Sequence, residues 1–218
     1  MGVTSGVRNG RPTPDHWSDP PPQGEGSYRP NRWSLLGLAH ELAPAFPLCT
    51  LRQASASRRL LEALRLACPE GITIEICDLI AGLPIFNPDD EGERTPPVVA
   101  KFAGKIGEAD GLIVSCPEYA HGIPGGFKNA LDWLVSRDEV PFKPMMFAHA
   151  SHRGDLVLEQ LADVLQTMSL RIVSDAFLRL PIAGKGDEAQ VAILSQARES
   201  GLLQASLSRF AEAICTEA

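Results

Sequence analysis

Short apolar runs alternate with amphipathic stretches along most of this chain, and this alternation restricts the fold more than any other feature. The strand-like runs are residues 33–38, 72–77, 111–116, 144–150 and 171–180. Nearly continuous apolar runs indicate strands that are buried on both faces, and strand-helix alternation is typical of a parallel sheet between helices. We therefore predict one α/β domain over residues 33–218, a three-layer sandwich whose five-stranded parallel sheet has the order 2-1-3-4-5.

The helical stretches between these runs are predicted from apolar residues at spacings of three, four and seven. The apolar faces are Leu60, Leu61 and Leu64; Val98, Val99, Phe102 and Ile106; Phe127, Ala130, Leu131 and Leu134; and Val157, Leu161, Val164, Leu165 and Met168. A last helical region covers residues 188–214, with a break at Gly201. Trp133 lies off the third stripe, and we expect it to pack against a neighbouring element or subunit. The apolar face of residues 127–134 together with Trp133 predicts a homodimer at least.

Composition narrows the class of protein further. The 218 residues carry a formal net charge of -7, which argues against nucleic acid or an anionic membrane as a partner. The five cysteines include no C-x-x-C pair, so we expect reduced thiols in a cytoplasmic protein and no metal site. Residues 1–32 hold six prolines and five glycines and are expected to be a disordered tail.

Two unusual loops are predicted to meet beyond the carboxyl ends of strands 1 and 3, where ligands bind in sheets of this order. The first, TLRQASASRR (residues 50–59), places hydroxyl groups and Arg52 just before a helix, where free N–H groups favour an anion. A simple helix-capping serine would explain the same pattern. The second, PEYAHGIPGG (residues 117–126), combines prolines that restrict the backbone with glycines that let a flat ring approach it.

The segment PEYAHGIPGGFKNALDWL resembles the signature of the NADPH-dependent FMN reductase family, whose flavodoxin-like members include quinone, azo-dye and chromate reductases. TLRQASASRRLLEAL is similar to the phosphate loop and first helix of this family, LPIFNPD to its segment after strand 2, and ASHRGD to its third flavin loop. The resemblance covers roughly residues 48–183.

The resemblance implies FMN as cofactor and NADPH or NADH as co-substrate. In this reading Thr50, Arg52, Ser55 and Ser57 hold the FMN phosphate and ribityl end, Pro117, Glu118, Tyr119 and Ala120 border the isoalloxazine, and Ser151 and Gly154 close its far side. No catalytic side chain is required, and His121 is a candidate proton donor. The implied partners are a small electron acceptor (flavin, quinone, azo compound or metal oxyanion) and further copies of the chain in a homodimer or homotetramer.

The start of the domain departs from the family pattern. Residues 40–48 separate the strand-like run 33–38 from the phosphate loop, and Cys49 stands where the family has glycine. If 46–49 is the first strand instead, Pro44 and Pro47 make it a poor central strand. We expect weakened FMN binding, and the alternative function is a flavin-poor, non-catalytic flavodoxin-like binding protein.

Overall fold

The computed structural model describes residues 46–49, without their side chains, and 55–216. All of them belong to one compact unit of the chain, Leu36–Ala218. The predicted tail 1–32 and the predicted strand 33–38 lie outside the described residues.

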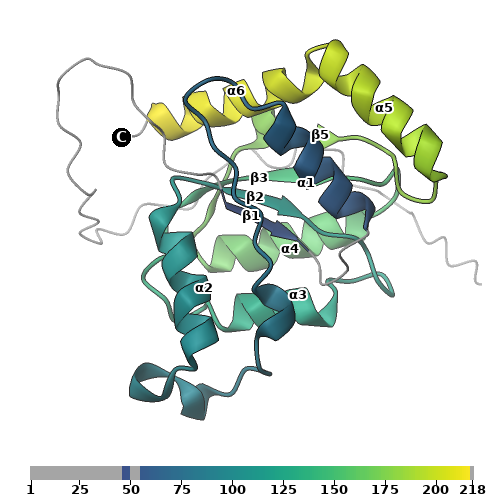
Figure 1. Cartoon of the computed structure of the whole chain (residues 1–218). Helices are drawn as coiled ribbons and strands as arrows, with labels where there is room; N and C mark the ends of the chain where they lie inside the picture. The colour runs from purple at the N-terminus through teal and green to yellow at the C-terminus, as the bar shows by residue number, and fades with distance from the viewer. Residues whose placement is uncertain (1–45, 50–54, 217–218) are drawn as a thin grey trace, which may run out of the picture. The chain divides into compact units, whose positions relative to one another are not determined.

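A parallel sheet forms the centre of this unit (Figure 1). Its strands are β1 (Phe46–Cys49), β2 (Leu112–Ser115), β3 (Pro144–His149), β4 (Arg171–Ile172) and β5 (Leu178–Arg179). The order is β1-β2-β3-β4, and β5 also pairs with β3. Each of the four strand pairings is parallel, as the alternating sequence predicts.

The first strand of the described residues is β1, which ends at Cys49, directly before the predicted phosphate loop. The expectation that residues 40–48 form an insertion between strand and loop is therefore wrong. Among the described strands β1 pairs only with β2, in parallel register from Phe46–Leu112 to Cys49–Ser115, so Pro47 does not prevent this pairing.

The second predicted strand, residues 72–77, is not a regular strand, since only Ile74 makes an isolated bridge. Ile74 and Cys77 are nonetheless buried. The apolar pattern correctly predicted that residues of this segment are buried, but a buried segment need not form a continuous ladder of strand hydrogen bonds. The described pairings therefore do not include this segment, and the complete order 2-1-3-4-5 stays a prediction.

The last predicted strand, 171–180, is divided by a 3₁₀ turn at Ser174–Ala176. β3 advances from Met145 to Ala148 while the outer chain advances from Ile172 to Leu178. The surplus residues leave the ladder in the turn, where the Ala176 carbonyl accepts a hydrogen bond from the buried hydroxyl of Ser206 (2.6 Å).

Within residues 55–216, six α-helices cover the two faces of the sheet and confirm the predicted helical stretches. They are α1 (Ala56–Leu66), α2 (Pro97–Glu108), α3 (Gly125–Asp132), α4 (Asp155–Thr167), α5 (Asp187–Glu199) and α6 (Leu202–Cys215). The predicted break is confirmed, because Gly201 lies between α5 and α6 with a φ of 75°.

Alternate residues of β2 and β3 face two separate hydrophobic cores. Leu112 and Met145 belong to the core with α2, α3 and α4, whereas Ile113 and Met146 belong to the core with α1 and α6. Figure 1 shows the corresponding layers, with α1, α5 and α6 on one side of the strands and α2, α3 and α4 on the other. The three-layer prediction is therefore correct for the described residues.

Trp133 corrects one expectation about assembly. Its side chain is 1% exposed within a single chain, its Nε1–H donates to the carbonyl of Pro84 (2.8 Å), and its ring meets that of Phe86 edge-on at 5.1 Å. Asn129 holds the same segment, because its Nδ2 donates to the Pro84 carbonyl (2.9 Å) and its Oδ1 accepts from the N–H of Phe86 (2.7 Å). Trp133 anchors an irregular segment to α3 and is not a surface residue for a partner subunit.

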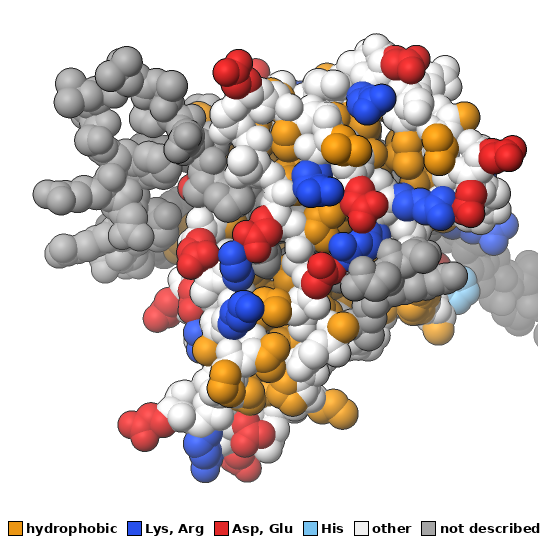
Figure 2. Space-filling view, viewed as in Figure 1, with side chains coloured by type: hydrophobic (Ala, Val, Ile, Leu, Met, Phe, Trp, Pro, Cys, Tyr) orange, Lys and Arg blue, Asp and Glu red, His pale blue; other side chains and the backbone are white. Residues whose placement is uncertain are grey.

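The face shown in Figure 2 carries acidic and basic side chains interspersed with hydrophobic ones. Such mixing spreads the formal charge of -7 and does not concentrate it in a field of one sign on this face.

Candidate functional site

A cavity of about 320 Å³ lies where the strands of the parallel sheet end. It is lined by residues from the start of α1, the ends of β2 and β3, the loop after β5 and the start of α5: Ser55, Ala56, Ser57, Arg59, Cys116, Pro117, Tyr119, His149, Ala150, Ser151, Ala183, Gly184, Asp187 and Gln190. The carboxyl ends of parallel strands share one edge, so the topology brings these distant segments together.

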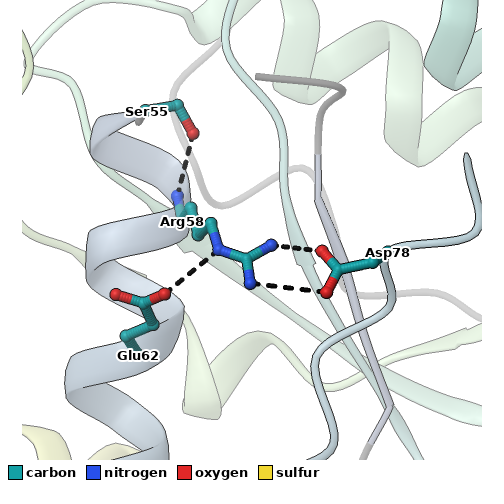
Figure 3. Close-up of polar contacts among 4 residues, drawn as sticks. All are labelled: Ser55, Arg58, Glu62 and Asp78. Carbon is teal, nitrogen blue, oxygen red and sulfur yellow. Dashed lines mark hydrogen bonds and ion pairs between the residues drawn. The ribbon is translucent and has the colours of Figure 1, made fainter. Parts of the chain in front are cut away.

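Ser55 and Ser57 lie at the beginning of α1. Ser55 is the N-cap, and its Oγ accepts a hydrogen bond from the backbone N–H of Arg58 (3.1 Å; Figure 3). Ser57 is buried and also lines the cavity. Thr50 and Arg52, the other two predicted phosphate ligands, lie outside the described residues. Ser55 therefore caps α1, as the simpler interpretation of the sequence expected, and it also forms part of the cavity wall.

Two consecutive arginines of α1 have different surroundings. Arg58 is paired with Asp78 through Nη1 and Nη2 and with Glu62 through Nε (3.1 Å), as Figure 3 shows. Arg59 lines the cavity, where its Nη1 contacts Asp187 (2.8 Å) and Gln190 (3.3 Å). Arg59 was not among the residues predicted from the sequence, although its position four residues after Ser55 places both on one helix face.

The loop after β2 forms a tight turn at residues 119–122. Tyr119 and Gly122 exchange backbone hydrogen bonds (3.1 and 3.0 Å), and the two residues between them, Ala120 and His121, have left-handed φ values of 49° and 60°. Non-glycine residues adopt this conformation at a cost, so surrounding contacts must hold it. The turn presents Tyr119, which is 55% exposed, at the cavity wall.

Glu118 and Gln160 supply those contacts. Glu118 accepts a hydrogen bond from the N–H of Val157 in the first turn of α4 (3.3 Å), and its other oxygen lies 3.2 Å from Nδ1 of His121. Gln160 of α4 donates to the carbonyl of His121 (3.0 Å). Glu118, Ala120 and His121 are not among the described cavity residues, and the His121 side chain is 82% exposed. The described role of Glu118 is to fasten the turn to α4.

The loop after β3 packs tightly on a buried histidine. His149 is 1% exposed, and its Nε2 lies 2.5 Å from the carbonyl of Arg153, which fixes the proton on Nε2 because a carbonyl can only accept. Gly154 has a φ of 103°, and a Cβ there would lie 2.6 Å from Nε2 of His149. The absence of a Cβ at Gly154 therefore lets the loop pack against His149. Ser151 lines the cavity, and its Oγ accepts a hydrogen bond from the N–H of Arg153 (3.1 Å).

The buried imidazole makes stability depend on pH. Burial lowers the pKa of His149 below its ordinary value of 6.5, and the positive charge of Arg179 lowers it further. Hydrogen bonds to the backbone of Arg153 and Cys116 and the charge of Asp155 raise the pKa, but the net shift is downward. The unfolded chain then binds more protons, so the free energy of unfolding should fall as pH drops below about 6.5. Urea unfolding of the wild type and of His149→Gln at pH about 7 and about 5 measures this, and the variant should lose less stability on acidification. Equal losses in both proteins would contradict the assignment.

The structure therefore brings together Ser55, Ser57, Pro117, Tyr119 and Ser151 from the predicted site, and it adds Arg59, His149, Asp187 and Gln190. The last two follow the final strand, and the shared carboxyl edge of a parallel sheet is the signal that would have found them.

This arrangement defines a class: α/β proteins with a parallel sheet whose ligand cavity lies at the carboxyl ends of the strands. Within that class, the chain belongs to the NADPH-dependent FMN reductase family, whose model matches residues 47–184.

Individual relatives match a shorter part of the chain. An NAD(P)H-dependent FMN reductase of Pseudomonas aeruginosa is 40% identical over 97 residues, which cover 44% of this chain and 51% of that protein. An NAD(P)H:quinone oxidoreductase of Solanum tuberosum is 46% identical over 91 residues, covering 39% of this chain and 46% of that protein. The chain thus spans about half the length of the curated relatives that it matches.

Solved structures support the fold. FerB, a flavoenzyme NAD(P)H:(acceptor) oxidoreductase from Paracoccus denitrificans, has a TM-score of 0.66 at 22% identity over 79% of this chain and 97% of that one. An NAD(P)H:quinone oxidoreductase from Methanothermobacter marburgensis has a TM-score of 0.53 at 20% identity over 73% of this chain and 98% of that one. The chain has the α/β flavodoxin-like fold. None of the helices formed by residues 55–216 has the length and apolar character required to cross a bilayer.

Proposed function

We propose that the protein is an FMN-dependent NAD(P)H oxidoreductase that passes hydride from NADPH or NADH through bound FMN to a small acceptor. The observation that carries this proposal is the single cavity that unites hydroxyl groups at the start of α1 with Pro117, Tyr119 and Ser151. Family membership supports the same conclusion.

The chemistry of the lining residues fits FMN. Ser55, Ser57 and the cation of Arg59 suit a phosphate group, which binds hydroxyls, guanidinium groups and helix N-termini. Pro117, Ala150 and Tyr119 supply nonpolar and flat surface of the kind that an aromatic ring system needs. When bound, FMN supplies the hydride-transfer chemistry, so the side chains need only bind and orient it.

We assign the phosphate and ribityl end to Thr50, Arg52, Ser55 and Ser57, and the ring to Pro117, Tyr119 and Ser151. The remaining predicted residues act through backbone shape in this proposal. Glu118 and Ala120 set the turn that presents Tyr119, and Gly154 lets the loop after β3 close over His149. His121 stays a candidate proton donor in this proposal, although its side chain is 82% exposed and is not among the residues that line the cavity.

Addition of NADPH or NADH under anaerobic conditions should bleach the visible absorbance of the FMN complex. Steady-state rates with a quinone should then give the parallel lines of ping-pong kinetics, because one cavity serves both substrates in turn. Flavin, azo compound and metal oxyanion are the other acceptors to compare. FMN binding without bleaching by either coenzyme would reject the reductase and favour a non-catalytic flavin-binding protein.

We also propose a homodimer or homotetramer in the cytoplasm. Free thiols at Cys68, Cys77, Cys116 and Cys215 fit a reducing compartment. Light scattering at micromolar concentration tests the assembly, and a mass near 23.5 kDa would contradict it.

A further inference from the structure

Three side chains from two helices form one wall of the cavity: Arg59 of α1, and Asp187 and Gln190 of α5. Arg59 Nη1 lies 2.8 Å from Oδ1 of Asp187 and 3.3 Å from Oε1 of Gln190. Gln190 is 9% exposed, and its Nε2 donates to the carbonyl of Lys185 (2.7 Å). Both ends of the Gln190 amide are thus engaged, which fixes the acceptor that orients Arg59.

The contacts leave much of the Arg59 guanidinium available. Both of its side-chain contacts within the described part of the chain are made by Nη1, whereas a guanidinium has five N–H donors in a planar fork. A fork of this kind matches the oxygen atoms of a phosphate. Because Ser55 and Ser57 line the same cavity, hydroxyl groups and a cation converge there from one helix.

We propose that Arg59 recognises the phosphate of the bound flavin, oriented by Gln190 and partly neutralised by Asp187, so that this cluster distinguishes FMN from unphosphorylated flavin. The inference rests on the proposed function, because it assigns further residues to the same cofactor site. It concerns the class of phosphate monoesters, of which FMN is the member that the site would hold.

Electrostatics explain why a phosphate would compete with Asp187. The Asp187 side chain is 82% exposed and that of Arg59 is 32% exposed, and ion pairs between such groups contribute little. A phosphate dianion forms shorter, charge-assisted hydrogen bonds and can take two N–H donors of one guanidinium. Asp187 lowers the positive potential at the cavity wall before the phosphate arrives, so its removal should strengthen FMN binding.

Arg58 provides a matched control on the same helix. Its guanidinium is engaged by Asp78 and Glu62 (Figure 3), and it is not among the residues that line the cavity. A general effect of removing one positive charge from α1 should therefore appear equally in variants of Arg58 and Arg59. A phosphate contact should appear only in variants of Arg59.

Titration of FMN and riboflavin by fluorescence quenching tests the proposal, because the two ligands differ only by the phosphate. Arg59→Gln should weaken FMN about tenfold and leave riboflavin unchanged, as expected for the loss of a charge-assisted hydrogen bond. Asp187→Asn should tighten FMN about threefold and leave riboflavin unchanged, as expected for the loss of a weak competing ion pair. Arg58→Gln should change neither the affinity for FMN nor the affinity for riboflavin.

Equal changes for FMN and riboflavin in Arg59→Gln, or unchanged FMN affinity in both Arg59→Gln and Asp187→Asn, would overturn the inference. Asp187→Asn keeps the test decisive if Arg59→Gln does not fold, because Asp187 is exposed and its replacement leaves the core intact. A wild-type protein that binds neither flavin would reject the proposed function itself, whereas a wild type that binds FMN with no selectivity over riboflavin would reject only this inference.

Discussion

Replacement of Trp133 by alanine is expected to lower the free energy of unfolding by about 3–5 kcal/mol, the usual cost of truncating a buried aromatic side chain. The ring is 1% exposed and edge-on to Phe86, so its loss opens a cavity that the rigid end of α3 cannot fill. The segment that contains Pro84 and Phe86 would also lose the hydrogen bond from Trp133, although it would keep those to Asn129. Chemical denaturation followed by far-ultraviolet circular dichroism measures the change.

Trp133→Phe is the matched control. It keeps most of the ring volume and removes the Nε1–H donor, while Asn129 still donates to the Pro84 carbonyl. Because no buried carbonyl is left unpaired, we expect a loss of only about 1 kcal/mol from the hydrogen bond. The mass from light scattering should match that of the wild type for Trp133→Phe. An alanine variant as stable as the wild type, or a phenylalanine variant that dissociates, would show that this side chain has another role.

Gly154→Ala is expected to destabilise the protein by about 2–5 kcal/mol, which adds roughly 1–2 for a left-handed alanine to roughly 1–3 for overpacking. The new Cβ would lie 2.6 Å from Nε2 and 2.8 Å from Cε1 of His149, a ring that is buried and held by Arg153. Relief would require His149 to move at the cavity wall. Thermal unfolding should show the loss, and FMN titration should show weaker binding.

Gly184 separates backbone strain from the clash. It also lines the cavity with a positive φ of 78°, but a Cβ there would meet no atom within 4 Å. Gly184→Ala should therefore cost only about 1–2 kcal/mol from its left-handed conformation. Equal losses in the two alanine variants would mean that contact with His149 contributes nothing.

The structure decides between the two positions that the sequence left open for the strand before the predicted phosphate loop. A run of apolar residues at 33–38 has higher strand propensity than FPLC at 46–49, because Pro47 removes a donor. The structure places β1 at Phe46–Cys49 all the same, in register with β2 and directly before the predicted phosphate loop. Pairing with a neighbouring strand outweighed local propensity, which is a weak guide for strands.

The sequence by itself determined the alternation of strands and helices, the buried faces of the helices and the two loops that carry the family signature. These features are local, because helical periodicity and turn residues act over a few positions along the chain. Only the tertiary structure decided that Arg59 of α1 contacts Asp187 of α5, and that Trp133 donates to the carbonyl of Pro84 and is not exposed to a partner subunit. It also decided that Gly154 faces His149. These contacts depend on how the segments pack in three dimensions, and the periodicity of one segment does not encode which residue it meets.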